Sequence, residues 1–255
     1  MELTRKPVPR REHVLELGTD PKERTSTTGY GWPHRITDSY RLRALRSVFA
    51  QLSGSVIDYG CGTKPYEAPL RHAKITGWVG IDYASRTSGD AHANRADFFL
   101  NDGRIPLASD LFDIALSTQV FEHVEDLGAV LSELKRVLRP GATLVATCPM
   151  TSPLHEEPFD FRRFTPYGLQ TEARQYGFEL IRSVALGGPI STISTLIALY
   201  LHPVHRLPVV GRWAHHALVE AVTRGGALIE AMAFRRGFTQ SSICFDFLFV
   251  LKSLK

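Results

Sequence analysis

Hydrophobic residues in the middle of this chain recur in two alternating patterns. Short apolar runs typical of buried strands occupy residues 55–60 (SVIDYG), 77–83 (GWVGIDY), 112–118 (FDIALST) and 142–149 (ATLVATCP), with a weaker run at 95–99 (RADFF). Helical spacing of apolar residues appears weakly at 65–73 (PYEAPLRHA) and strongly at 126–141, where a Pro-Gly pair stops it. Strands that alternate with helices at this interval predict parallel βαβ units, with helices on both faces of a sheet.

Further elements flank this alternation. The spacing from Tyr40 to Leu52 predicts a helix that starts near Ile36 and ends at Ser53 and Gly54. Toward the other end, the pattern predicts a helix at 166–176, a strand at 178–186 and a closing strand at 243–253. Residues 1–34 are polar and broken by Pro and Gly, which predicts an N-terminal arm or lid.

The fold class expected from these patterns is α/β: a doubly wound, mostly parallel sheet with an N-terminal helical arm and a helical insertion before the last strand. Residues 35–255 are expected to form one domain, with the insertion at about 188–240. In sheets of this kind, ligands bind beyond the carboxyl ends of the strands, where the strand order reverses.

Composition narrows the function classes. With 255 residues and 44% hydrophobic residues, the chain can bury a sizeable core. Its 30 Lys and Arg against 26 Asp and Glu leave a formal charge of +4, so a nucleic-acid partner is not expected without a clustered basic face. Three widely separated cysteines fit neither a disulfide framework nor a zinc site with CxxC spacing, and no apolar run is long enough to span a membrane. A cytoplasmic location, with peripheral membrane contact as a further option, is the expectation.

Two glycines directly after the first strand raise the question of a ligand. Gly60 and Gly62 follow Asp58, and the second strand ends at Asp82. Glycine lets another molecule approach the main chain, and a carboxylate at the tip of the second strand suits two ribose hydroxyls. A plain turn and a surface carboxylate are the alternatives. Pro65 stands where a GxGxxG dinucleotide motif has its third glycine, which weakens the nicotinamide dehydrogenase interpretation.

From about residue 54 to 181 the chain resembles the class I S-adenosylmethionine-dependent methyltransferases. VIDYGCGT is similar to the glycine-rich first motif of that family, GIDY to its second motif, and ADFF to the segment that meets the adenine. The long helix and the strands on either side of it, residues 112–149, are similar to the fourth and fifth strands of the family. The resemblance implies S-adenosylmethionine as cofactor and S-adenosylhomocysteine as product. Lys64 departs from the family, because many members have a third glycine there.

The resemblance also implies roles for individual residues. Gly60, Cys61 and Gly62 would line the cofactor, while Asp58 would organise the loop beneath it. Asp82 would hold the ribose hydroxyls. The remaining implied contacts are Tyr83 beside the adenine, Asp97 at its amino group, Phe98 through a backbone amide, and Ser117 and Gln119 near the methionine end. The arm would fold over the cofactor with Tyr30 near its carboxylate; a disordered arm is the alternative.

The acceptor is expected to meet residues 150–169 (MTSPLHEEPFDFRRFTPYGL), which follow the fifth expected strand and resemble a segment of methyltransferases in glycan and natural-product pathways. His155 is the candidate general base, oriented by Glu156, Glu157 or Asp160, and His123 competes for that role. In the alternative interpretation, Asp160 pairs with the neighbouring arginines and Thr165 caps the next helix. No metal site is expected, because neither HEEPFD nor the pair His215 and His216 has an HExxH spacing.

The insertion at 188–240 is apolar and carries four histidines and five arginines against two acids. Its first apolar run, residues 190–201, is too short to span a bilayer, and residues 213–232 predict a helix with apolar and arginine-bearing faces. The insertion would cap the acceptor pocket, pack against a second copy in a homodimer, or lie on a lipid surface.

The expected activity is therefore methylation by S-adenosylmethionine of a small-molecule, sugar, glycan or lipid-linked (glycolipid) acceptor. Oxygen is the expected methyl acceptor, with nitrogen or carbon as alternatives. A membrane-associated quinone-type C-methyltransferase is a variant within the same class. A non-catalytic S-adenosylmethionine-binding regulatory or scaffold protein and an RNA methyltransferase are the alternatives from other classes.

Overall fold

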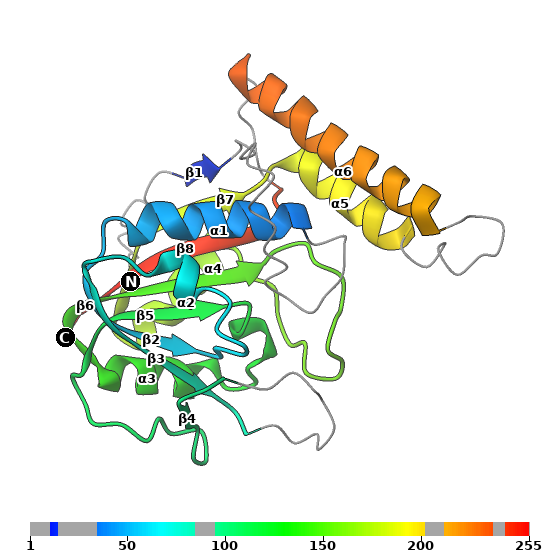
Figure 1. Ribbon diagram of the computed structural model, residues 1–255. Coiled ribbons are helices and arrows are strands. Elements are labelled where there is room, and N and C mark those ends of the chain that lie inside the picture. Colours follow the sequence, from blue (N-terminus) through cyan, green and yellow to red (C-terminus); the bar gives the residue numbers. More distant parts are fainter. Residues whose placement is uncertain (1–10, 15–34, 85–94, 202–211, 237–242, 255) are drawn as a thin grey trace, which may run out of the picture.

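The structure is a computed structural model that describes residues 11–14, 35–84, 95–201, 212–236 and 243–254 (Figure 1). The chain alternates between strands and helices, as the sequence pattern predicts. In chain order the elements are β1 (Arg11–Val14), α1 (Arg35–Phe49), β2 (Gly54–Tyr59), α2 (Glu67–Leu70), β3 (Ile75–Asp82), β4 (Phe98–Phe99), β5 (Phe112–Thr118), the 3-10 helix η2 (Phe121–His123), α3 (Leu127–Val137), β6 (Leu138–Pro149), α4 (Pro166–Gln175), β7 (Phe178–Leu186), α5 (Pro189–Leu201), α6 (Arg212–Arg235) and β8 (Asp246–Ser253).

The strands form one sheet in the order β1-β7-β8-β6-β5-β2-β3-β4. Neighbouring strands are parallel except β8, which runs antiparallel to both β6 and β7. The order reverses between β2 and β5, since β2 pairs with β3 on one side and with β5 on the other. The doubly wound α/β prediction is confirmed, and the reversal marks where such sheets hold ligands.

Helices cover both faces of the sheet because successive strand side chains point to opposite faces (Figure 1). Val56 of β2 packs in a core with α1 and α2, which contains Leu45 and Phe49. Its neighbour Ile57 packs in the opposite core with α3 and α4, where Leu131 is fully buried. Both cores are therefore built by a strand whose two faces are buried, which explains its continuous apolar run.

Four elements differ from the sequence expectation. The arm at 1–34 contributes a strand: β1 pairs in parallel with β7, with Arg11 opposite Ser183. β6 begins at Leu138, before the Pro-Gly pair that was predicted to separate helix from strand, and a register shift opposite β5 absorbs the extra residues. The predicted strand at 95–99 is reduced to Phe98–Phe99, and α1 ends at Phe49 instead of extending to Leu52.

The inserted helices α5 and α6 form a hairpin that projects from the body of the molecule (Figure 1). Glu230 of α6 joins them, because its carboxylate accepts from the backbone amides of Gly188 (2.8 Å), Ile190 (2.9 Å) and Ser191 (3.2 Å) at the start of α5. The first amides of a helix have no backbone carbonyl partner within it, and the Glu230 carboxylate accepts their hydrogen bonds. Its negative charge also interacts favourably with the positive end of the helix dipole. Within the described ranges, none of the helices combines the length and the apolar character needed to cross a bilayer.

Candidate functional site

A cavity of about 360 Å³ lies at the carboxyl ends of the central strands, beside the point where the strand order reverses. Its volume falls within the range of roughly 300–1,000 Å³ that small-molecule sites have. Six parts of the chain line it: the loop after β2, the loop after β5, residues 152–156 after β6, α1 through Asp38 and Arg41, α5 through Leu199, and Phe245 before β8. The cavity therefore stands where the sequence patterns placed the ligand.

The loop after β2 is held in a left-handed conformation by its two glycines, with φ of 72° at Gly60 and 50° at Gly62. A Cβ on Gly60 would lie 2.4 Å from Val120 Cγ2, so the protein's own packing requires glycine there. A Cβ on Gly62 would meet nothing within 4 Å. The main chain is thus open to a ligand at Gly62, while Gly60 lets the loop after β5 approach.

Asp82 at the end of β3 is tied to this loop. Its Oδ2 accepts from the Gly62 amide at 2.8 Å, and its Oδ1 accepts from the Tyr83 amide at 2.7 Å. A carboxylate oxygen has two lone pairs, so each oxygen keeps acceptor capacity for a further donor. The side chain is partly exposed. Asp82 is therefore oriented by the backbone and presents two acceptors beside the open glycine.

The two other loop residues singled out from the sequence are buried. Asp58 lies at the end of β2, where Trp78 Nε1 donates to its Oδ2 at 3.3 Å, and burial raises the pKa of its carboxyl to about 7. Burial also raises the pKa of the Cys61 thiol to about 12. A thiol with that pKa stays protonated at neutral pH, so Cys61 is a packing residue and not a nucleophile.

Lys64 adopts the left-handed conformation with φ of 56°, although it stands where many members of the resembled family have glycine. Its Nζ lies 2.6 Å from Asp97 Oδ2, which also accepts from the Gly80 amide at 2.7 Å. This pairing lowers the pKa of Asp97 against the effect of burial. The ion pair compensates the backbone cost of a non-glycine residue at this position, and it also occupies one oxygen of the carboxylate that was expected at the adenine.

The remaining cofactor candidates spread around the same edge. Tyr83 and Phe98 are about half exposed, and the Tyr83 hydroxyl lies 3.3 Å from that of Tyr59. Ser117 is buried, and its Oγ has no hydrogen-bond partner among the described residues. Gln119 lines the cavity and has a φ of 55°. Its backbone amide donates to the backbone carbonyl oxygen of Thr147 at 2.8 Å. Tyr30 lies outside the described residues.

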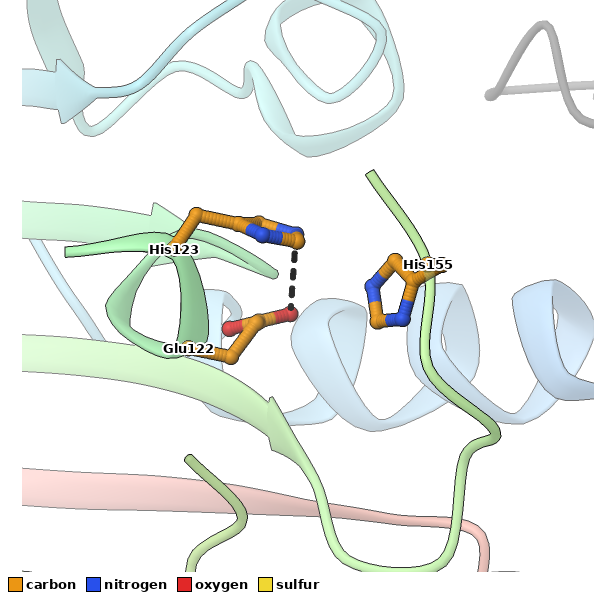
Figure 2. A group of neighbouring side chains, drawn as sticks. All are labelled: Glu122, His123 and His155. Atoms are coloured by element: carbon orange, nitrogen blue, oxygen red, sulfur yellow. Dashed lines mark ion pairs between the residues drawn. The ribbon is translucent and has the colours of Figure 1, made fainter. Parts of the chain in front are cut away.

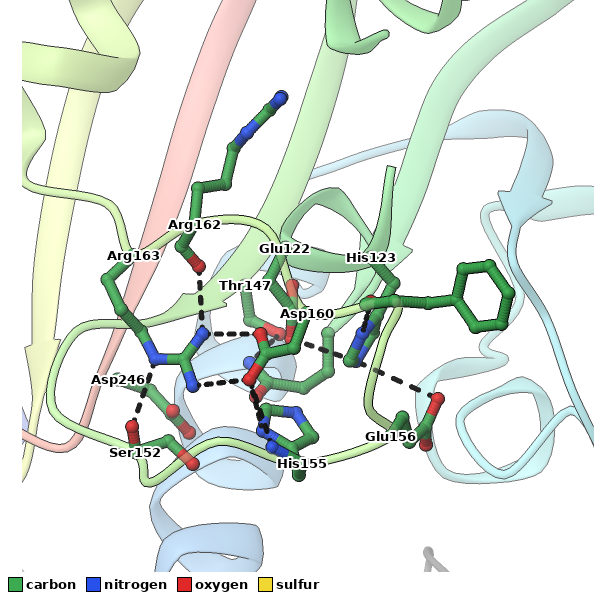
Figure 3. A network of polar contacts seen from close by, with 12 residues as sticks. Glu122, His123, Thr147, Ser152, His155, Glu156, Asp160, Arg162, Arg163 and Asp246 are labelled. Atoms are coloured by element: carbon green, nitrogen blue, oxygen red, sulfur yellow. Dashed lines mark hydrogen bonds and ion pairs between the residues drawn. The ribbon is translucent and has the colours of Figure 1, made fainter. Parts of the chain in front are cut away.

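The segment after β6 is organised around Asp160 and Arg163. The guanidinium of Arg163 holds both oxygens of Asp160, at 2.5 and 2.8 Å, and lowers the pKa of that carboxyl to about 2. The same guanidinium donates to the carbonyls of Ser152 and Pro153 (Figure 3). The alternative expectation for this segment thus holds as well, since Thr165 Oγ1 accepts from the Gly168 amide and caps α4.

His155 is positioned by this framework. Its amide donates to Asp160 Oδ2 at 3.0 Å, and its ring Nδ1 lies 3.0 Å from the carbonyl oxygen of Pro153. Because a carbonyl only accepts, Nδ1 carries the ring proton and Nε2 keeps its lone pair. Of the three carboxylates considered from the sequence, Asp160 therefore contacts and orients His155.

His123 lies against His155, with ring centroids 4.8 Å apart and the rings nearly perpendicular at 86°. Its Nδ1 is 2.7 Å from the carbonyl oxygen of Phe159, so it also carries its proton on Nδ1. Burial lowers the pKa of His123, which keeps the ring neutral near pH 7. Both predicted histidines thus line the cavity with Nε2 as a lone-pair donor, and Glu156 lines it beside them with φ of 55°.

Sequence reasoning missed Glu122. Its side chain is fully buried beside both histidines, as Figure 2 shows, and neither carboxylate oxygen has a hydrogen-bond partner within the described part of the chain. Burial raises the pKa of Glu122 to about 8, and the charge of Asp246 adds to this effect. The only sequence feature that marked Glu122 was its position directly before His123. A charged residue in such a segment is usually interpreted as a surface residue.

Comparison with known proteins finds a methyltransferase domain in the region of this site. A family model described as a methyltransferase domain matches residues 57–146, which contain the glycine loop, Asp82 and the strands on both sides of the switch point. This match agrees with the resemblance of the sequence motifs to the class I S-adenosylmethionine-dependent methyltransferases.

The individual relatives found for this chain are distant. The chain is 32% identical over 120 residues to a demethylmenaquinone methyltransferase of Mycobacterium marinum, covering 46% of this chain and 51% of the relative. It is 29% identical over 134 residues to an O-methyltransferase of Pyrenophora dematioidea, covering 49% and 48%. The chain thus spans about half the length of these curated relatives.

Among solved structures, the chain is similar to the [4+2]-cyclase SpnF, with a TM-score of 0.53 and 18% identity over 84% of this chain and 80% of that chain. A likeness at this level of identity concerns the fold alone. Since SpnF is described as a cyclase, activity has to be argued from the site of each chain.

Proposed function

We propose that this methyltransferase moves a methyl group from S-adenosylmethionine to an oxygen of a small-molecule, sugar or lipid-linked acceptor. The observation that carries the proposal is that the open main chain at Gly62 and the two histidines His123 and His155 line one cavity. A cofactor seat and a proton acceptor would thereby lie in one cavity, which brings the two bound molecules close enough for transfer.

The residues present fit the cofactor. Asp82 offers one acceptor lone pair on each carboxylate oxygen to the two ribose hydroxyls. The Gly62 main chain has open space on its Cβ side, and Gln119 lines the same cavity. Ser117 lies two residues before Gln119, at the end of β5, and its buried hydroxyl has no hydrogen-bond partner among the described residues. When bound, S-adenosylmethionine supplies a methyl group on a positively charged sulfur, which needs no covalent nucleophile from the protein.

The acceptor-side residues support oxygen as the methylated atom. A hydroxyl has to lose its proton as it is alkylated, and the His155 Nε2 lone pair is available because Nδ1 is fixed as a donor to Pro153. Asp160 also holds His155 in place, because its carboxylate accepts a hydrogen bond from the His155 backbone amide. His123 is the second candidate for the same proton, and Glu156 completes the proposed catalytic set.

A lipid-linked or otherwise apolar acceptor is supported by the α5–α6 hairpin. Leu199 of α5 lines the cavity, so the hairpin contributes to the acceptor side. Several large apolar side chains of the hairpin are exposed, namely Ile193, Ile197, Tyr200, Leu228, Ile229 and Met232. The sequence of the insertion has five arginines against two acids, which favours an anionic lipid surface. We propose peripheral membrane contact through this hairpin, with a homodimer contact as the alternative.

The experiment is turnover of the purified chain with S-adenosylmethionine and a panel of hydroxyl-bearing sugars, phenols and lipid-linked glycans, read as S-adenosylhomocysteine formed. His155→Gln is expected to lower turnover by roughly 100-fold or more while cofactor affinity by calorimetry is kept. His72→Gln, a histidine at the distant α1–α2 contact, is the matched control and should act as wild type. Cofactor binding without product from any acceptor would contradict the proposal and favour a non-catalytic binding protein.

A further inference from the structure

Three metal-ligating side chains meet at the wall of the cavity. One ligand atom each from Glu122, His123 and His155 lies within 4.8 Å of the others, and His123 Nε2 is 3.9 Å from Glu122 Oε1 (Figure 2). Ligands bound at about 2.0–2.2 Å from one ion lie roughly 3 to 3.5 Å apart, so closure requires side-chain movements of about 1–2 Å. His155 stands in the segment between β6 and α4 and Glu122 in the short η2, so neither of these two ligands lies on a strand of the sheet.

The histidines are prepared as ligands by their outer contacts. Each ring donates through Nδ1 to a carbonyl oxygen, His123 to Phe159 at 2.7 Å and His155 to Pro153 at 3.0 Å. In metal sites, a ligating histidine almost always donates its other ring nitrogen to a carbonyl or carboxylate, which fixes the tautomer and the ring. Asp160 Oδ2, 3.3 Å from His155 Nδ1, adds a negative charge on that outer side (Figure 3).

Glu122 supplies an independent observation. Its side chain has 0% exposure, and neither carboxylate oxygen finds a hydrogen-bond donor within the described residues. A buried carboxyl group without a hydrogen-bond partner is costly, and buried carboxyl groups in proteins are usually hydrogen-bonded, paired or bound to a metal. Glu122 faces the histidine rings in Figure 2, so a cation held between them would give its oxygens a partner.

We propose that Glu122, His123 and His155 bind a divalent transition-metal cation of the zinc class, with the remaining coordination position open to the cavity. Two imidazoles and one carboxylate are the ligand set of catalytic zinc sites, which keep one position for water or substrate. This site was not expected from the sequence because its ligands come from two segments separated by 32 positions and have no motif spacing. With the cation bound, the Nε2 lone pairs of His123 and His155 are used for coordination. Glu156, whose carboxylate lies 3.9 Å from His123 Nε2, then takes the role of proton acceptor in place of His155.

The test is a titration of untagged, chelator-treated, full-length chain with Co²⁺, read by its visible ligand-field absorption, followed by displacement with Zn²⁺. One saturable equivalent is expected, and Glu122→Gln and His155→Gln are each expected to lower the affinity by at least about tenfold. The metal should also raise the thermal midpoint of wild type and not that of the two variants. His72→Gln is the matched histidine control and should bind as wild type.

The proposal is overturned if wild type shows no saturable equivalent, or if both variants bind as wild type does. Circular dichroism of each variant establishes folding, and His155→Gln serves alone if Glu122→Gln fails to fold. The titration contains no S-adenosylmethionine. Failure of cofactor binding in a separate titration would therefore reject the proposed function and leave the metal result standing.

Discussion

Asp58 is a carboxyl group that the fold holds in an unusual protonation state. Burial raises its pKa to about 7, with Asp82 and Glu67 adding to that effect, while Trp78 and Lys64 oppose it. An unfolded chain has the ordinary aspartate pKa near 4. Between these values the folded chain keeps a proton that the unfolded chain has released. Stability contributed by Asp58 is therefore present below about pH 4, falls as the pH rises to about 7, and is constant above that.

We predict that Asp58→Asn removes this pH dependence, because asparagine keeps an acceptor for Trp78 and does not titrate. From pH 5 to pH 7, wild type should lose about 2 kcal/mol more of its free energy of unfolding in urea than the variant does. Asp113→Asn is the control. The pKa of Asp113 is lowered, so the pH dependence that Asp113 contributes lies below pH 5 and does not affect the comparison between pH 5 and pH 7. Equal losses in wild type and Asp58→Asn would contradict the assigned pKa.

Single residues also show where sequence reasoning stops. Gly62 and Asp82 could be predicted as site residues because a glycine and a carboxylate at strand ends have few roles. Gly60 was readable as a glycine, but its cause, the close approach of Val120, depends on a loop 60 positions away. Glu122 was not readable, since burial of a charged side chain is decided by the tertiary contacts that close over it and not by its neighbours in the chain.

At the scale of elements, the α5–α6 hairpin is the part least explained by the sheet. Two of its exposed apolar residues, Tyr200 and Leu228, are 77% and 58% exposed. The double variant Tyr200→Glu and Leu228→Glu is predicted to lose binding to vesicles of anionic phospholipid, measured by sedimentation, while keeping the wild-type fold. The matched control Ile181→Glu alters an exposed residue of β7, 48% exposed, and should sediment as wild type.

The membrane prediction is contradicted if wild type does not sediment with the vesicles. Sedimentation velocity of the same samples then tests the homodimer alternative, because the double variant would dissociate a dimer held by the hairpin. Either result identifies what covers the apolar side chains of this element.

Elements with a strong period were predictable and those without it were not. β5 and β7 have the predicted bounds because their apolar runs are continuous and end at turn residues. β1 was not predicted, since four residues are too few to show an alternating pattern. Its formation depends on pairing with β7, which is distant in the sequence. β6 was expected to start after Gly141, but it starts at Leu138. A register shift in its pairing with β5 accommodates the additional residues.

At the scale of the whole molecule, the sheet order places the candidate site. The switch between β2 and β5 brings the glycine loop, the segment with His123 and the segment with His155 to one edge. The sequence predicted this edge as the ligand position because parallel strands end on the same side. The contact between the two histidines could not be predicted, because it depends on how residues 152–160 fold back through Arg163 and Asp160.

The most direct measurement for this account is the calorimetric affinity of S-adenosylmethionine for wild type and for Asp82→Ala. Loss of two ribose hydrogen bonds should weaken binding by about 1 to 3 kcal/mol, or roughly 5- to 150-fold. Asp113→Ala, at the opposite end of the strands where it accepts from Ser55, should bind as wild type. Equal affinity of wild type and Asp82→Ala, or no binding by wild type, would contradict the central claim that Asp82 and the open main chain at Gly62 hold the cofactor.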